Sequence, residues 1–304
     1  MKKTLIALAI LTVSGASFAQ SSVSISGGMR VGIKNNDAGT TVAADQSSGN
    51  TVNFNIVEDL GGGLAFTGSS QLRYWSENGQ TNNTSGVGNN AAGFHLAAIG
   101  LKGGFGHVQA GRIGLDQLWG FNPFGSNGAH VNVSGTGGAT ENGQIRYTSP
   151  SFSGFTAVLA TTQKLNTTGA TNNGSQFIVN YANGPLAASV VSEKVALNGT
   201  KYTGVGASYD LGVAKLMFIA ANDKNAAGVK TKDGQSISAT VPFGAFTGKI
   251  GFMNDKLAAN QDKTSIGVDY ALSKRTTLEA NTYKTKNETT VTGQNTWIGV
   301  RHSF

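Results

Sequence analysis

Apolar and polar residues alternate with a period of two along most of this chain, and Val, Ile, Phe, Tyr and Thr are prominent. The clearest runs place apolar residues at Val52, Phe54 and Ile56, at Phe177, Val179 and Tyr181, and at Ile266, Val268 and Tyr270. The residues between them are polar or small. A period of two predicts strands that have one apolar and one polar face. After residue 19, no segment sustains the 3.6-residue period of an amphipathic helix.

The connections between these predicted strands alternate between two kinds. Short turns are predicted at 58–63, 103–104, 149–154, 183–184, 210–212, 242–244 and 273–275. The other connections are mostly longer and rich in Asn, Gly, Thr and Ala, as at 34–49, 77–91 and 113–142. Seven short turns and eight longer loops make 15 connections, and therefore 16 strands. Strands of about 10 residues then leave about 8 residues for each connection, as in transmembrane β-barrels.

The predicted fold is an all-β, transmembrane, antiparallel β-barrel of 16 strands. Closure of the sheet gives every backbone group a partner in lipid, and an even strand number returns both chain ends to the short-turn side. A secreted soluble β-sandwich is the competing fold, since it also alternates apolar and polar positions. The barrel is favoured because the polar face is too Gly-rich and too polar to pack a dry core.

The amino terminus has the pattern of a targeting signal. Lys2 and Lys3 precede an apolar run over 5–11, and small residues follow this run. This order predicts an export signal over 1–19 and a single outer-membrane barrel domain over 20–304. A core helix is the alternative interpretation of the first segment, but the glycine and serine after the apolar run disfavour it.

Composition and charge exclude several classes of protein. The 304 residues include 43 glycines, no cysteine, and 23 basic against 16 acidic residues. Lack of cysteine excludes a disulfide scaffold and any Cys-ligated metal. The histidines, at positions 95, 107, 130 and 302, have no metal-ligand spacing, and no nucleophile–base–acid cluster is evident. We therefore expect no enzymatic activity, metal or cofactor, and the dispersed basic residues make nucleic acid an unexpected partner.

Five short segments, taken together and in their order, resemble those of a known family. They are EDLGGGL at 58–64, AGR at 110–112, IRYTSPSFSG at 145–154, YALSKRT at 270–276 and VRHSF at 300–304. In this order, after an export signal, they resemble the Gram-negative general porins of the neisserial and β-proteobacterial type. The resemblance implies a water-filled, 16-stranded barrel, usually trimeric, whose third long loop folds inward and narrows the pore. The third long connection here is 113–142, which is also the longest.

The resemblance also implies a function and partners. It implies an outer-membrane channel for passive diffusion of small hydrophilic solutes and inorganic ions, set in outer-membrane lipid and lipopolysaccharide. It further implies that Val300, His302 and Phe304 form a terminal-strand signal for the barrel-assembly machinery. An aromatic residue of the interface belt explains the last position equally well. A pore-poor barrel that acts as an adhesin or structural surface protein is the alternative function.

Charged residues on the inner wall of such a pore decide which ions pass. If the apolar positions face lipid, the side chains of Arg30, Arg73, Arg146 and Arg301 point inward. Arg112 has the parity of Val108 and Ala110, and the resemblance alone makes it a pore-wall arginine. Asp269 and Glu279 are expected to face the interior singly, as part of a polar lumen.

The predicted constriction loop carries few acids and several aromatic residues. Asp116 and Glu141 are its only acids, near its two ends. Trp119, Phe121 and Phe124 are expected to dock the loop on the inner wall, whereas an ordinary exposed loop is the alternative. The pore-lining arginines outnumber these acids, which predicts a weak to moderate preference for anions.

Overall fold

Antiparallel strands account for most of the described chain. The structure, a computed structural model, describes residues 21–36, 39–44, 50–76, 93–114, 118–124, 129, 131, 140–163, 172–257, 261–286 and 291–304. The strands are β1 (Ser22–Asn36), β2 (Gly39–Ala44), β3 (Asn50–Gly61), β4 (Leu64–Tyr74), β5 (Leu96–Gly103), β6 (Gly106–Gly114), β7 (Thr140–Thr148), β8 (Phe155–Thr162), β9 (Gly174–Asn183), β10 (Leu186–Lys194), β11 (Lys201–Asp210), β12 (Lys215–Lys224), β13 (Lys230–Phe243), β14 (Phe246–Asp255), β15 (Gln261–Ala271), β16 (Thr276–Lys286) and β17 (Val291–Ser303). A 3₁₀ helix, η1 (Leu118–Phe121), lies between β6 and β7 in the chain.

The sheet closes on itself through its first and last strands. Along one edge β1 pairs with β17, from Gly28 opposite Ser303 to Asn35 opposite Thr296. Along its other edge β1 pairs with β3 in its first half and with β2 in its second half. Since β2 and β3 share one position, the 17 strands of the described residues form a 16-position barrel. The predicted fold is confirmed, and the alternative of an open sandwich is wrong.

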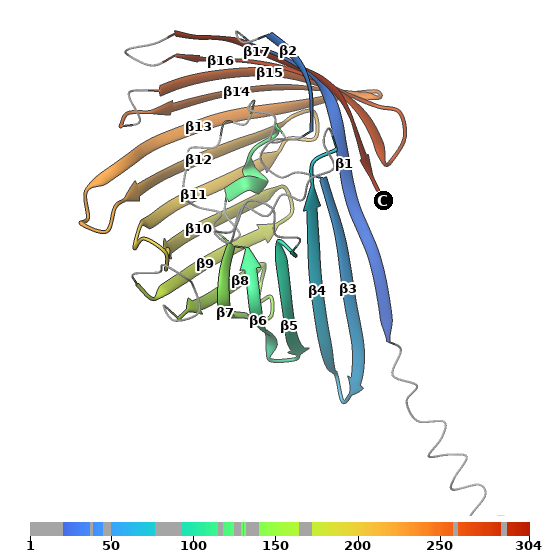
Figure 1. Cartoon of the computed structure of the whole chain (residues 1–304), viewed down its shortest axis with the longest axis vertical. Coiled ribbons are helices and arrows are strands. Elements are labelled where there is room, and N and C mark those ends of the chain that lie inside the picture. Colours follow the sequence, from blue (N-terminus) through green and yellow to red (C-terminus); the bar gives the residue numbers. More distant parts are fainter. Residues whose placement is uncertain are drawn as a thin grey trace, which may run out of the picture.

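The predicted connections are found on the two ends of the barrel (Figure 1). Short turns join β3 to β4, β5 to β6 and β7 to β8. Short turns also join β9 to β10, β11 to β12, β13 to β14 and β15 to β16. One predicted long connection, 34–49, differs from expectation, because β1 continues to Asn36 and β2 forms part of it. The connection at 77–91 and the export signal at 1–19 lie outside the described residues. Both ends of the barrel chain lie on the short-turn side, where Ser303 N–H donates to the carbonyl of Arg275.

The two faces of the sheet follow the alternation of the sequence. In β1 the side chains of Val23, Ile25 and Val31 are exposed on the outer face, whereas Arg30 is mostly buried on the inner face. Outward apolar residues recur on every side of the barrel, as lipid contact requires. No helix in the described part of the chain is long and apolar enough to cross a membrane.

A segment of the longest connection lies inside the barrel. Figure 1 shows η1 within the ring of strands, on the inner side of β11 and β12. The buried apolar cluster of the protein forms where this segment meets the wall. It comprises Leu118, Phe124, Ala129, Val131, Val158, Ile178, Val191, Tyr202, Ile219, Ala221 and Met253. The barrel interior is therefore partly filled from one side.

Candidate functional site

Two glycines on the inner face of β11 make room for η1. A Cβ atom added at Gly206 would lie 2.8 Å from Cε2 of Phe121, and one added at Gly204 would lie 2.9 Å from Cδ1 of Leu118. Carbon atoms prefer separations of about 3.5–4.0 Å. The two loop side chains therefore rest directly on glycine backbone, in space that any larger residue would occupy.

A third glycine, on β14, supports the next part of the same segment. A Cβ atom at Gly251 would lie 3.0 Å from Cε2 of Phe124 and 3.0 Å from Cγ2 of Val131. Asn122 ties these two loop residues together, because its Oδ1 accepts from the N–H groups of both at 3.3 Å. We call Gly204, Gly206 and Gly251 the glycine seats. They fix where the loop segment lies against the wall.

The aromatic residues expected to dock the loop do not all face the wall. Phe124 is buried in the apolar cluster, and Phe121 packs against it. Trp119 is 41% exposed, whereas its neighbour Leu118 is fully buried. Leu118 was not among the residues predicted to dock the loop. The available signal was the pair of inward glycines, Gly204 and Gly206, at alternate positions in β11.

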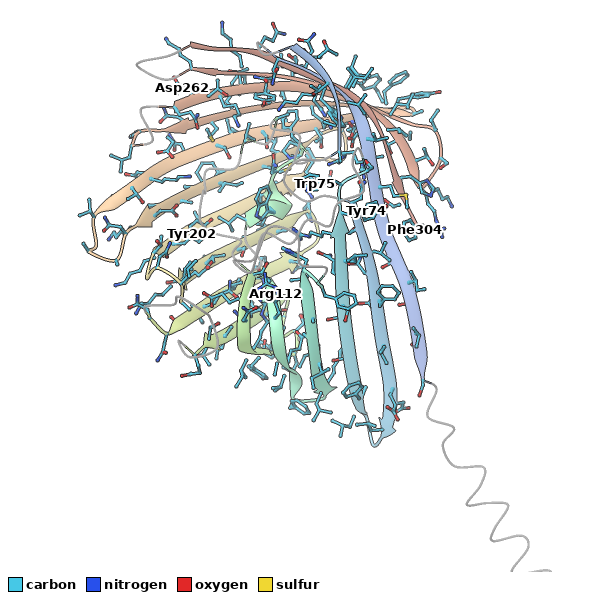
Figure 2. The ribbon with its side chains drawn as sticks, viewed as in Figure 1. Tyr74, Trp75, Arg112, Tyr202, Asp262 and Phe304 are labelled. Carbon is cyan, nitrogen blue, oxygen red and sulfur yellow. The ribbon has the colours of Figure 1, made fainter. Side chains whose placement is uncertain are left out.

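Arg112 stands where the chain leaves β6 for the loop (Figure 2). Its Nε donates to the carbonyl of His95 at 2.8 Å, and its Nη1 donates to Oδ1 of Asn142 at 2.5 Å. Both acceptors are neutral. Within the part of the chain that the structure describes, Arg112 has no ion pair with a carboxylate. Among the described residues, no carboxylate therefore neutralises its positive charge at the root of the loop.

A register shift explains the position of Arg112. The pairing of β6 with β7 shifts between Gly111 and Ile113, so that Asn142 and a neighbouring glycine oppose Arg112 alone. Gly143 has a φ of 64°, which side-chain-bearing residues adopt at a cost. The extra residue of this bulge lies in β7. Within β6, Gly111 directly before Arg112 has a φ of 144°, which interrupts the regular alternation of faces there. The parity of Arg112 within β6 matches that of Val108, but parity is therefore an unreliable guide to the direction of this side chain.

His95 lies just before the start of β5, where the charges of both Arg112 and Arg73 act on its side chain. Its Nε2 lies 3.1 Å from Oγ1 of Thr140, at the other root of the loop. Burial, together with the positive charges of Arg73 and Arg112, lowers the pKa of His95 from 6.5 to about 4. The imidazole is therefore neutral at pH 7. The effect of both guanidinium groups on one side chain indicates a positive potential at this point.

Arg73 in β4 and Arg146 in β7 also lie near the root of the loop. Arg73 Nε donates to Oε1 of Gln71 at 2.7 Å. Arg146 is buried, and its Nη2 donates to the carbonyl of Gly114 at 2.6 Å. Arg146 thus also contacts the first root of the loop.

The acids predicted at the two ends of the loop have different outcomes. Glu141 is buried at the start of β7, and its Oε1 accepts from the N–H of Ala196 at 2.6 Å. Its carboxylate therefore holds the connection between β10 and β11. Asp116 lies outside the described residues.

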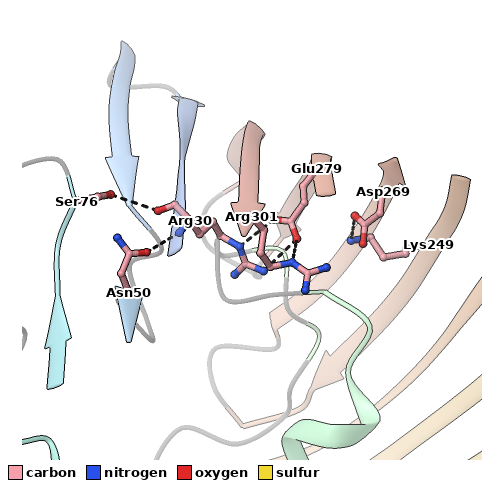
Figure 3. Close-up of polar contacts among 7 residues, drawn as sticks. All are labelled: Arg30, Asn50, Ser76, Lys249, Asp269, Glu279 and Arg301. Carbon is pink, nitrogen blue, oxygen red and sulfur yellow. Dashed lines mark hydrogen bonds and ion pairs between the residues drawn. The ribbon is translucent and has the colours of Figure 1, made fainter. Parts of the chain in front are cut away.

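Glu279 bridges the seam where the barrel closes (Figure 3). Its Oε2 lies 2.9 Å from Nε of Arg30 in β1, and its Oε1 lies 2.8 Å from Nε of Arg301 in β17. The Glu279 side chain is 3% exposed, whereas those of Arg30 and Arg301 are 13% and 41% exposed. The two arginines and one carboxylate together carry one net positive charge. The expectation that Glu279 faces the interior singly is wrong, because strand register brings both partners beside it.

Asp269 also has a partner that its position in the sequence did not predict. Nζ of Lys249 in β14 lies 2.5 Å from Oδ1 of Asp269 in β15. The same ammonium group lies 5.5 Å from the centre of the Phe124 ring, a cation–π distance. The prediction of a single inward carboxylate is therefore wrong here too. This ion pair lies next to the third glycine seat and helps to hold the loop.

The terminal strand closes the barrel with its last residue. The N–H of Gly27 donates to the carbonyl of Phe304 at 2.9 Å, and the N–H of Phe304 donates to the carbonyl of Gly27 at 3.1 Å. A Cβ atom at Gly27 would lie 2.6 Å from Cζ of the Phe304 ring, so this ring lies over the glycine. Val300 pairs with Val31, and the His302 Nδ1 atom lies 2.9 Å from Oγ1 of Thr276.

Comparisons with known proteins agree with this geometry. The family model of Gram-negative porins matches residues 4–290. The chain belongs to the Gram-negative porin family. Among curated relatives, outer membrane porin protein 32 of Delftia acidovorans is 31% identical over 328 residues, which cover 95% of this chain and 90% of the relative. Major outer membrane protein P.IB of Neisseria lactamica is 27% identical over 355 residues, covering both chains completely.

Solved porins share the fold. An anion-selective porin from Comamonas acidovorans has a TM-score of 0.76 and 24% identity, and the match covers 94% of this chain and 100% of that porin. A loop-deletion mutant of OmpT from Vibrio cholerae has a TM-score of 0.71 and 15% identity, with 93% and 99% covered. The family resemblance stated from the sequence is confirmed. This porin is an outer-membrane protein that forms a channel, and members of its family are channels rather than enzymes.

Proposed function

We propose that this porin is a homotrimer whose pores pass small hydrophilic solutes and inorganic ions with a weak to moderate preference for anions. Passage is by passive diffusion, without catalysis or a cofactor. Arg30, Arg73, Arg112, Arg146 and Arg301 supply the positive charge of the pore wall, against Glu141, Asp116 and Glu279.

The arrangement around Arg112 carries this proposal. Arg112 and Arg73 act on one imidazole, and the hydrogen-bond acceptors of Arg112 are neutral groups. A guanidinium remains charged at any working pH, so the local field is fixed. Charges are felt over about one Debye length, roughly 10 Å at physiological ionic strength. Arginines beside the loop therefore attract anions that enter the narrow part of the pore.

The seam arginines contribute less to selection. Arg30 and Arg301 share the carboxylate of Glu279, which cancels one of their two charges. The porin from Comamonas acidovorans that is named as anion-selective shares the fold with this chain. The preference proposed for this chain rests on its own arginines.

The remaining parts of the proposal follow the family resemblance. Residues 1–19 direct export and are removed, and residues 20–304 form the barrel. Val300, His302 and Phe304 present the terminal strand to the barrel-assembly machinery. The exposed apolar outer face meets membrane lipid and the neighbouring subunits. Chemical cross-linking of the purified porin should give a limiting species of three chains.

Zero-current potentials of Arg112 variants in a planar bilayer test the selectivity. In a KCl gradient, Arg112→Gln should move the zero-current potential toward the cation side, and Arg112→Glu should move it further. Arg112→Lys retains the charge and should leave the potential close to that of the unmodified porin. Lys274→Gln, in an exposed turn, is the matched control for net charge. Equal potentials for Arg112→Gln and Lys274→Gln would refute the role of Arg112.

A further inference from the structure

Three lysines from neighbouring strands stand in register at the loop end of the barrel. Lys194 at the end of β10 lies opposite Lys201 at the start of β11, and Lys201 lies opposite Lys224 at the end of β12. Directly opposed residues have Cβ atoms about 5 Å apart on the same face of the sheet. We call Lys194, Lys201 and Lys224 the lysine row.

The lysine row faces outward. Its sequence neighbours Glu193, Tyr202 and Asp223 are buried in the barrel interior, and successive side chains of a strand point to opposite faces. Lys201 and Lys224 are exposed, and Lys194 is half-buried. Because the loop end of an outer-membrane barrel is extracellular, the row lies at the outer leaflet.

No described residue neutralises the lysine row. Within the described residues, none of the three lysines has a carboxylate at ion-pair distance. Lys230, the next lysine along the edge, shows the contrast, since its Nζ lies 2.9 Å from Oδ2 of Asp233. Like charges directly opposite one another destabilise a sheet. An anion from outside the chain would relieve the repulsion within the row.

From the lysine row toward the short turns, the outward residues change from charged to polar and then to apolar. An amphipathic glycolipid has the same order of phosphate, sugar and acyl groups. One step toward the short turns, the outward residues carry hydroxyl and amide groups: Ser192, Thr203 and Asn222. The following rows are apolar: Val190, Val205 and Ala220, then Ala188, Ala207 and Phe218, then Leu186, Tyr209 and Leu216. The lysines lie four residues from the first apolar row along β10 and β11. At about 3.3 Å per residue this is roughly 13 Å along a strand, so the lysines lie well beyond the apolar rows.

We propose that the lysine row binds the phosphate groups of a phosphorylated glycolipid of the outer leaflet. The hydroxyl and amide side chains of the middle row bond the sugar and amide groups of this lipid, and the apolar rows contact its acyl chains. The site is distinct from the pore, so it does not depend on ion selectivity.

Binding of defined lipids to the purified full-length porin tests this site. The measurement is the number of lipid molecules retained per barrel, by native mass spectrometry, after titration with diphosphoryl lipid A. Each ammonium near an anionic surface contributes roughly a fivefold gain in affinity. The variant with Lys194, Lys201 and Lys224 all changed to Gln should therefore bind about a hundredfold more weakly. The same three positions changed to Arg should retain binding, and channel conductance should be unchanged in both variants.

A second set of lysines at the same end of the barrel provides the control. Lys256, Lys284 and Lys286 are exposed, and the cross-strand partners of the last two are not lysines. Their replacement by Gln removes the same charge and should leave lipid A binding unchanged. Equal losses in the two triple variants would show that net charge alone is responsible and would overturn the proposal. Phosphatidylglycerol binding as tight as that of lipid A would overturn the assignment to a glycolipid.

Discussion

Replacing Gly206 with alanine places a methyl group where the ring of Phe121 now rests. The new Cβ atom would lie 2.8 Å from Cε2 and 3.0 Å from Cγ of the ring. Because carbon atoms prefer about 3.5–4.0 Å, the ring must move by roughly 1 Å. Overpacking of a filled site costs about 1–3 kcal/mol when nothing yields.

The loop segment is the part that yields. Each strand of the wall is hydrogen-bonded to neighbours on both sides, whereas η1 rests on the wall through side chains. Phe121 should therefore move away from β11 and into the lumen. We predict that Gly206→Ala lowers the single-channel conductance and the size limit for neutral sugars, while the barrel remains folded.

Planar bilayer recording and liposome swelling measure these two quantities. Removal of the ring in the double variant Gly206→Ala, Phe121→Ala should restore or exceed the original conductance, because the clash is gone. Gly248→Ala is the control, since its Cβ atom would lie 3.6 Å from Cε1 of Phe243, an ordinary contact. If Gly206→Ala conducts as well as Gly248→Ala, the ring of Phe121 does not set the width of the pore.

Three further predictions concern the loop and the wall. Leu118→Ala should lower the unfolding free energy by about 3 kcal/mol, because this side chain is fully buried. Trp119→Ala, at an exposed position, should change the unfolding free energy by about 0.5 kcal/mol or less. Equal urea midpoints for the two variants would contradict this difference. Glu279→Gln should strengthen anion preference and destabilise the barrel by about 3 kcal/mol, because Arg30 loses the carboxylate partner of a mostly buried ion pair. An unchanged zero-current potential would argue against it. His95 has a lowered pKa, so stability that is complete above pH 6.5 should be lost progressively as the pH falls toward 4. His95→Gln should remove that pH dependence, and its persistence in this variant would assign it to another group.

The strand pattern could be predicted from the sequence because the membrane imposes it. Outward positions must be apolar along each membrane-spanning strand, so Val52, Phe54 and Ile56 reveal both the strand and its face. The short turns are similarly evident from their Gly, Pro, Asn and Ser residues. What the pattern could not show was β2, which extends the edge of β1 beyond the predicted loop boundary.

The interior was predictable in direction but not in detail. Parity identified Arg30 and Glu279 as inward residues, yet only the register of β1, β16 and β17 shows that they form an ion pair. The irregular backbone at Gly111 and the bulge opposite Arg112 make parity unreliable at the arginine that most affects the proposed selectivity. The glycine seats depend on contacts between a loop and distant strands. Alternate glycines in β11 indicate open space on the inner face, but they do not show which loop residues fill it.

The charge that the open pore presents to ions is measured most directly as the zero-current potential of the unmodified porin. A planar bilayer with a tenfold KCl gradient should show conductance rising in three equal steps for each inserted trimer. Under zero current, the sign of the potential should be that of a chloride-preferring pore. A potassium-preferring sign, or a barrel that inserts without conducting, would contradict a water-filled lumen whose wall is positive.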